Sequence, residues 1–365
     1  MGRVPIDLTV SNPTRCDLPY PPDLLLPLAD PAGLDYRPDA MGPESTRRAI
    51  ASVFRRWNND IDPSSIMLTG STSEAYSLLL KLLCDPGDTV LVPTPSYPLF
   101  DQLTRLDGVT ARPFALDPSD DWRPSLDELA AAPDTTRAVI LVHPNNPTGS
   151  HVHPDDAAAV EALCRDRDWA LIVDEVFLPY RLDGGPGSTR SFAGADRCLN
   201  FTLGGLSKMA GLPQVKLGWV VVGGPDEEKQ HALERLDYIA DAYLSVNTPA
   251  ALAAPRLITS AEAVQAAIGD RCRRNLEVLR SAAAEVPAVT VPPVGGGWSA
   301  LVRLPAIVDD EVLALQLLTE HGVAVQPGYF FDLPDEGTFV LSLLTPEPVW
   351  DRGLSTIFDT VRSWL

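Results

Sequence analysis

Short apolar runs that alternate with helix-length segments are the feature that most constrains the fold of this chain. The runs that read as buried strands lie at residues 90–92, 110–114, 138–142, 170–173, 199–203 and 219–222. Segments with helical periodicity separate them, at residues 44–57, 75–83, 98–106, 126–132 and 155–165. Strands that are apolar throughout are buried on both faces, and helical connections between them favour parallel pairing. The sequence therefore predicts an α/β fold with a large, mostly parallel sheet between helices.

The pattern changes near residue 275. Two long helices are expected at residues 227–243 and 262–285, and after them a helix at 310–321 lies among expected strands at 289–294, 300–304 and 339–343. Glycine and proline turns separate these later elements, which is typical of a smaller α+β unit. We therefore expect an N-terminal arm (residues 1–35) that packs with a small C-terminal domain (275–365), and a large domain between them (36–274).

Composition and charge limit the classes of partner. The 365 residues are 45% hydrophobic and 21% charged, which is ordinary for a globular protein. The net charge of −20 would repel nucleic acid and anionic lipid, so neither is expected as a partner. No apolar run is long enough to span a membrane. The five cysteines form no C-x-x-C pair and the start of the sequence lacks a signal pattern, so we expect free thiols and a cytoplasmic location.

The glycine-rich segment 203–219 carries the strongest chemical signal. Lys208 follows Ser207 directly, and a second cation, Lys216, stands eight residues later. A partly desolvated lysine loses its proton readily and can attack an aldehyde to form a Schiff base. The serine hydroxyl and the second cation are suited to holding a phosphate group nearby.

Three polar or aromatic residues follow other predicted strands. Asp174 ends the run at 170–173, where a carboxylate is costly unless it meets a cation or a proton donor; capping or a salt bridge is an equal alternative. Asn146 lies in a Pro- and Gly-rich turn after the run at 138–142 and offers an amide donor. Tyr97 follows a further strand and can stack on a planar ring.

The segment Ser71-Thr72-Ser73-Glu74 has the spacing of a capping box at the start of a helix. Free backbone N–H groups and hydroxyls at such a helix start can bind phosphate. Taken alone, the motif favours an ordinary helix cap over a phosphate site.

In this combination and order, the motifs resemble those of the fold-type I pyridoxal-phosphate enzymes, specifically the class I/II aminotransferase (aspartate aminotransferase-like) family. The resemblance covers roughly residues 5–360. It implies a PLP-dependent transferase fold, with a seven-stranded type of sheet in the large domain and pyridoxal 5'-phosphate (PLP) as cofactor. It also implies transfer of an amino group between a small amino acid or amine and a keto acceptor, through a Schiff base at Lys208.

The resemblance assigns roles by position. Lys208 corresponds to the Schiff-base lysine, Asp174 to the carboxylate that pairs with the pyridine nitrogen, and Tyr97 to the ring-stacking aromatic. Asn146 corresponds to the amide that reaches the phenolic oxygen of the cofactor, and Val176 to a further cofactor contact. Tyr36 corresponds to a tyrosine lent to the neighbouring subunit, which implies a homodimer with shared active sites. The residues that correspond to the binding site for the cofactor phosphate, called the phosphate cup below, are Ser71, Thr72, Ser73, Ser207 and Lys216.

Three positions depart from the family pattern. Lys216 stands in place of an arginine, and a lysine cannot make the two-pronged contact with phosphate that an arginine makes. Phe177 stands in place of a tyrosine and lacks its hydroxyl. Val340 occupies the place of the arginine that clamps the substrate carboxylate, and an isopropyl group cannot make that contact. Either another cation, such as Arg303 or Arg37, binds the carboxylate, or the substrate is held differently.

Other functions remain open at this point. The loss at Val340 suggests, as an alternative, a same-fold enzyme of elimination, replacement, cyclisation or decarboxylation in a specialised biosynthetic pathway. A non-catalytic PLP sensor is disfavoured because Lys208 and Asp174 are both present. His151 and His153 lack a third ligand, so no metal site is predicted. Trp298 fits either the core or the wall of the substrate site.

Overall fold

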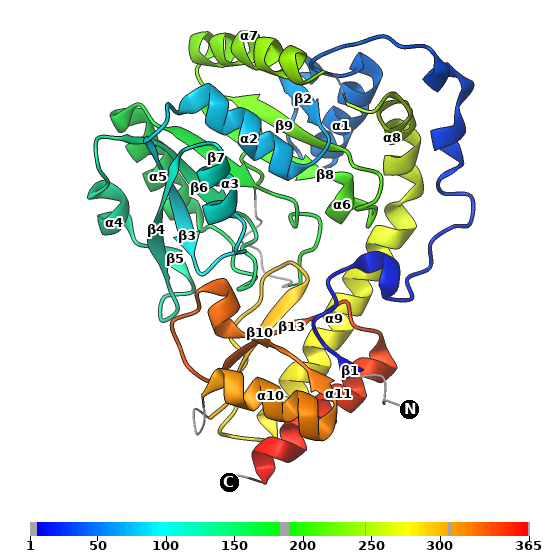
Figure 1. The fold of residues 1–365 in the computed structure, drawn as a ribbon, viewed down its shortest axis with the longest axis vertical. Helices are drawn as coiled ribbons and strands as arrows, with labels where there is room; N and C mark the ends of the chain where they lie inside the picture. The colour runs from blue at the N-terminus through cyan, green and yellow to red at the C-terminus, as the bar shows by residue number, and fades with distance from the viewer. Residues whose placement is uncertain (1–5, 183–189, 245, 306–308, 364–365) are drawn as a thin grey trace.

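A large mixed sheet dominates the computed structural model, which describes residues 6–182, 190–244, 246–305 and 309–363 (Figure 1). Its strands, in spatial order, are β2 (Ile66–Thr69), β9 (Gly218–Gly223), β8 (Asn200–Gly205), β7 (Ala170–Asp174), β6 (Thr136–Val142), β3 (Thr89–Thr94), β4 (Thr110–Asp117) and β5 (Arg123–Pro124). β8, β7, β6, β3 and β4 run parallel to one another. β9 is antiparallel to β2 and β8, and β5 is antiparallel to β4. The predicted α/β class and its mostly parallel sheet are confirmed.

Helices cover both faces of this sheet, which explains why its strands are apolar throughout. In β6, Ile140 packs with α2 and α7 on one face, while Leu141 packs with α4 and α5 on the other. At the β2–β9 end, Trp219 packs with α1 and α8. The helices are α1 (Glu44–Arg56), α2 (Thr72–Leu83), α3 (Phe100–Leu106), α4 (Leu126–Ala130), α5 (Pro154–Arg167), α6 (Leu206–Met209), α7 (Asp226–Tyr243) and α8 (Thr248–Ser260).

The C-terminal part is a smaller α+β unit beside the edge of the sheet (Figure 1). Its elements are α9 (Glu262–Ala284), β10 (Ser299–Arg303), α10 (Asp310–His321), β11 (Val323–Ala324), β12 (Gln326–Pro327), β13 (Thr338–Ser342) and α11 (Glu347–Arg362). β13 lies between β10 and β12 and is antiparallel to both. Short 3-10 helices lie at Pro13–Arg15, Leu26–Ala29, Pro31–Leu34, Pro63–Ser65 and Gly328–Phe331. Among the described residues, no helix is both long enough and apolar enough to cross a membrane.

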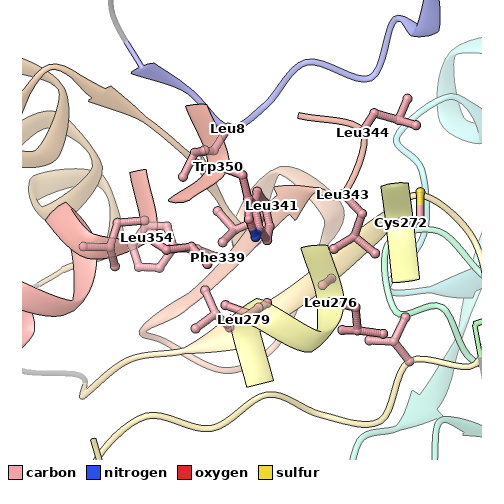
Figure 2. Close-up of a cluster of buried hydrophobic side chains, with 14 of the residues drawn as sticks. Leu8, Cys272, Leu276, Leu279, Phe339, Leu341, Leu343, Leu344, Trp350 and Leu354 are labelled. Carbon is pink, nitrogen blue, oxygen red and sulfur yellow. The ribbon is translucent and has the colours of Figure 1, made fainter. Parts of the chain in front are cut away.

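The N-terminal arm shares the core of this C-terminal unit. β1 (Ile6–Asp7) pairs with β11 in parallel, and the next residue, Leu8, is fully buried. Figure 2 shows Leu8 and Trp350 of α11 close to Leu341 of β13, with Leu279 of α9 below them. The indole N–H of Trp350 donates to the carbonyl oxygen of Asn275 at 3.0 Å, so the polar atom of this buried ring is satisfied. The domain limits at residues 35 and 275 stay a prediction.

One expected element in the second half of the chain is wrong, and one helix was missed. The strand expected at 289–294 does not form, and only Thr290 makes an isolated bridge, to Arg303. Pro292 and Pro293 lack backbone N–H groups and cannot extend a ladder. Helix α8 was not predicted, since Pro255 lies inside it and proline is a helix breaker.

We expect Leu341→Ala to lower the free energy of unfolding by about 3 kcal/mol, because it removes a fully buried side chain from the core in Figure 2. Chemical denaturation measures the change. Leu315→Ala on α10, where the side chain is 53% exposed, is the matched control and should change stability by less than about 0.5 kcal/mol. Equal losses in the two variants would contradict this assignment of the core.

Candidate active site

The pairing of parallel strands brings four predicted site residues to one edge of the sheet. Asp174 is the last residue of β7 and lies opposite Val142 of β6 and Leu203 of β8. Asn146 follows β6, Tyr97 follows β3 and Lys208 follows β8. These are the carboxyl ends of neighbouring parallel strands, where α/β proteins bind their ligands.

Asp174 is held by donors from two elements. The backbone N–H of Val176 donates to Oδ1 at 3.1 Å, and the hydroxyl of Tyr76 donates to Oδ2 at 3.1 Å. Neighbouring atoms crowd the carboxylate, and this desolvation raises its pKa to about 6, although both hydrogen bonds and the charge of Lys208 act to lower it. Tyr76 was not predicted as a site residue from the sequence. The available signal was its spacing of four residues from Thr72, which places both on one face of a helix.

Lys208 lies in the short helix α6 with its amine against aromatic rings. Its Nζ is 5.0 Å from the centroid of the Trp298 ring and 5.4 Å from that of Phe177. Burial lowers the pKa of Lys208, and the charge of Asp174 opposes this shift. The hydroxyl of Tyr180 donates to the backbone carbonyl of Lys208 at 2.6 Å and fixes the backbone below the amine. This setting favours the neutral, nucleophilic amine.

Trp298 is 2% exposed and therefore part of the core, and its ring also faces the amine of Lys208. Gly149 places it: Gly295 and Gly296 both donate backbone N–H groups to the Gly149 carbonyl, at 3.0 and 2.9 Å. Gly149 has φ +70°, and a Cβ there would lie 2.6 Å from Val294 Cγ1. Glycine is required at this turn because a side chain would separate the two segments.

Asn146 is joined to the C-terminal unit by a side-chain hydrogen bond. Ser299 at the start of β10 donates its hydroxyl to Asn146 Oδ1 at 3.3 Å. Because the hydroxyl engages the side-chain oxygen, the side-chain nitrogen of Asn146 is the group that can donate to a ligand.

The predicted phosphate cup gathers at a second corner of the same edge. Gly218 of β9 lies opposite both Thr69 of β2 and Gly205 of β8. This pairing brings together the segments that carry the predicted phosphate ligands Ser71, Thr72, Ser73, Ser207 and Lys216. Ser71 Oγ accepts from the Glu74 N–H at 3.1 Å, so the expected serine cap forms. The Glu74 carboxylate accepts from the N–H of Gly70, one residue before the cap residue that a capping box would use. Lys216 is exposed and has φ +59°.

Two aromatic site candidates lie on the surface. Tyr36 is 66% exposed and Tyr97 is 51% exposed. Tyr97 lies beside the C-terminal unit, because the backbone N–H of its neighbour Ser96 donates to the carbonyl of Phe331 at 3.2 Å. Tyr97 therefore lies where the large sheet meets the C-terminal unit.

Both arginines considered for the substrate carboxylate are paired with aspartates of this chain. Arg303 pairs with Asp335 at 3.0 Å and lies over the Trp122 ring at 6.0 Å. The Arg37 side chain is 85% exposed and pairs with Asp35. Val340 is 1% exposed inside an apolar cluster, so its position forms part of the core and no open subsite lies there.

The histidines near the site are structural. His143 is buried against His151, with ring centroids 5.3 Å apart, and burial together with His151 lowers the pKa of His143 to about 3. Its Nδ1 accepts from the Val152 N–H at 3.0 Å, and His153 caps α5 through the Asp155 N–H. In the part of the chain that the structure describes, no group of three or more His, Cys, Asp or Glu residues could hold a metal ion.

A second buried carboxylate, Glu175, supports the end of β7. Its Oε2 accepts from the Ser191 hydroxyl and its Oε1 from the Phe192 N–H, both at 2.6 Å. Burial, together with the charge of the adjacent Asp174, raises the pKa of Glu175 to about 8, although both hydrogen bonds act to lower it. The two hydrogen bonds tie residues 191–192 to the strand end that carries Asp174.

The comparisons with known proteins agree with this geometry. Residues 32–350 match the family described as aminotransferase class I and II, and the chain belongs to that family. It is 27% identical to an alanine aminotransferase of Mycobacterium tuberculosis over 100% of this chain and 86% of the relative. It is 33% identical to a capreomycidine synthase of Streptomyces vinaceus over 88% of this chain and 79% of the relative.

The fold is shared with solved structures. An alanine aminotransferase from Pyrococcus furiosus superposes with a TM-score of 0.87 at 24% identity, over 99% of this chain and 93% of the other. The family, the curated relatives and the fold together identify a PLP-dependent type of transferase, an aminotransferase of class I/II. They do not favour the alternative of elimination, replacement, cyclisation or decarboxylation.

We expect Glu175→Gln to change how stability depends on pH. The folded pKa of about 8 lies above the ordinary value of 4.5, so wild type loses stability as pH rises between these values and levels off above pH 8. The variant has no group to ionise there, so its thermal midpoint should rise relative to wild type between about pH 5 and 9. Glu277→Gln, at an exposed position of α9, is the control; parallel pH curves for Glu175→Gln and wild type would refute the expectation.

Proposed function

We propose that this aminotransferase binds pyridoxal 5'-phosphate at Lys208 and uses it to transfer an amino group between a small amino compound and a keto acceptor. The observation that carries the proposal is the pairing of a desolvated lysine with an anchored carboxylate at the same sheet edge. The pKa of Lys208 is lowered by burial, and Asp174 accepts donors on both of its oxygens.

The residues present fit each chemical group of this cofactor. The Lys208 amine suits the aldehyde, and the Asp174 carboxylate suits a protonated pyridine nitrogen. The start of α2 offers free backbone N–H groups to a phosphate, and Lys216 adds positive charge at the same corner. The amide of Asn146 suits the phenolic oxygen, and Tyr97 offers a ring for stacking. Val176 contributes through its backbone, which orients Asp174.

In the reaction, the cofactor supplies an electron sink for the bond that breaks at the substrate Cα. Lys208 Nζ, as a neutral amine, is suited to take the proton from that carbon. Asp174, with a pKa of about 6, is mostly charged near neutral pH. Trp298 and Phe177 lie against the amine, and this apolar setting favours its neutral form.

Replacing Lys208 with alanine should abolish both the absorbance of lysine-bound cofactor and aminotransfer, because no other amine is placed beside Asp174 in the described residues. Absorbance of purified protein mixed with PLP, before and after addition of a panel of amino acids and amines, measures both effects. In wild type an effective donor should convert the aldehyde form of the cofactor to its amine form.

The control is Lys229→Ala on α7, which should behave as wild type. An unchanged cofactor spectrum in the Lys208→Ala variant would refute the lysine assignment. A wild-type protein that consumes amino compounds without ever producing the amine form would contradict aminotransfer.

We further propose a homodimer with shared active sites. The segment that carries Tyr36 exposes several large apolar side chains, including Leu34 at 92% and Leu26 at 68%. Such a patch is typical of a surface covered by another subunit. The cytoplasmic location expected from the sequence stays a prediction.

Sedimentation equilibrium should give about twice the chain mass of 39.4 kDa. Tyr36→Phe should keep the dimer but weaken cofactor binding several-fold, because it removes only the hydroxyl that would reach the partner's phosphate. A monomeric wild type with full cofactor affinity would contradict shared sites.

A further inference from the structure

Tyr76 is a buried tyrosine whose hydroxyl points at the carboxylate of the site. It lies in the second turn of α2, is 2% exposed and packs edge-on against Phe100, with ring centroids 5.4 Å apart. Its hydroxyl donates to Asp174 Oδ2 at 3.1 Å. Burial and the nearby negative charge of Asp174 raise the pKa of Tyr76 well above its usual value, so the hydroxyl stays protonated and remains a donor.

The carboxylate of Asp174 receives one donor on each oxygen. Val176 N–H serves Oδ1 from the same strand end, and Tyr76 serves Oδ2 from a different element. The charged or ionisable groups facing it are Lys208 from α6 and Tyr76 from α2, while the adjacent Glu175 turns to Ser191 and Phe192 but still feels its charge. Two donors on opposite oxygens fix the plane of the carboxylate, and each oxygen retains a lone pair for a further donor.

Helix α2 connects this contact to the predicted phosphate cup. Ser71 caps the helix, and Thr72 and Ser73 form its first turn. Tyr76 follows them by four and three residues, so its side chain lies on the same helix face. One rigid element therefore carries residues suited to opposite ends of the same ligand.

We infer that Tyr76 is a positioning residue that orients Asp174 and keeps it charged for the ring nitrogen of the cofactor, an inference that rests on the proposed function. The phenol supplies a fixed donor where the crowded carboxylate has little access to water. Such a hydrogen bond stabilises the ionised form relative to the neutral acid.

The test is Tyr76→Phe, which keeps the ring packing and removes only the hydroxyl. We expect the Kd for PLP, titrated into cofactor-free protein, to rise about tenfold, the usual effect of losing a hydrogen bond to a charged group. The loss should grow as pH falls from about 8 to 6. The pKa of Asp174 lies at about 6 with the Tyr76 hydrogen bond lowering it, so without that bond more of the carboxyl is neutral in this range.

A second readout needs no cofactor. In cofactor-free protein, the thermal midpoint should fall more in the variant at pH 8, where Asp174 is charged and loses a donor, than at pH 5. Tyr20→Phe is the matched control because the Tyr20 hydroxyl donates to the Gly211 carbonyl at 2.6 Å and not to a carboxylate. Its effects should be the same at both pH values.

The outcomes separate the two proposals. A wild-type protein that does not bind PLP would overturn the proposed function, while the midpoint comparison would still test the charge-keeping role of Tyr76. If the wild-type protein binds PLP but the Tyr76→Phe variant loses the same amount of PLP affinity at pH 6 and at pH 8, the inference for Tyr76 is overturned.

Discussion

The pairing of β7 between β6 and β8 is the constraint on which the rest of the site depends. Parallel strands end at the same edge, so residues far apart in the sequence arrive together without a dedicated loop to carry them. Asp174 is tied into this edge by backbone as well as side chain, because its carbonyl accepts the N–H of His143 at 2.8 Å. A shift of one residue in this register would turn Asp174 to the opposite face of the sheet. The chemistry of the site is thus fixed by the same hydrogen bonds that build the core.

Two adjacent carboxylates show how the surroundings separate chemically similar groups. Asp174 has two donors and a nearby lysine, and its pKa is about 6. Glu175 points to the other side of the strand end, meets Ser191 and Phe192, and has a pKa of about 8 because burial dominates. At neutral pH the first is mainly charged and the second mainly protonated. Asp174 is therefore suited to binding a cation, and Glu175 is suited to a structural hydrogen-bond network.

Much of the fold was predictable because its signals are local. The helix cap at Ser71 and the helix 310–321 need only nearby residues to be recognised, and both form where predicted. Lys208 and Asp174 could be predicted as site candidates because each follows an apolar strand. The contact between Tyr76 and Asp174, and the ion pair between Arg303 and Asp335, depend on how distant segments pack. Nothing in the composition of either segment specifies these contacts, so neither could be predicted from the sequence pattern.

The strand β1 has a consequence for how the chain folds as it is made. Leu8 N–H donates to the carbonyl of Ala324, and Ser342 N–H donates to the carbonyl of Leu8, so the first part of the chain is held by residues made more than 300 positions later. A nascent chain can form its sheet early, but Leu8 lacks its partners until synthesis is almost complete. Such long-range closure slows folding, and the arm stays exposed in the meantime. A chain shortened before β13 would therefore release its N-terminus as well as its C-terminus.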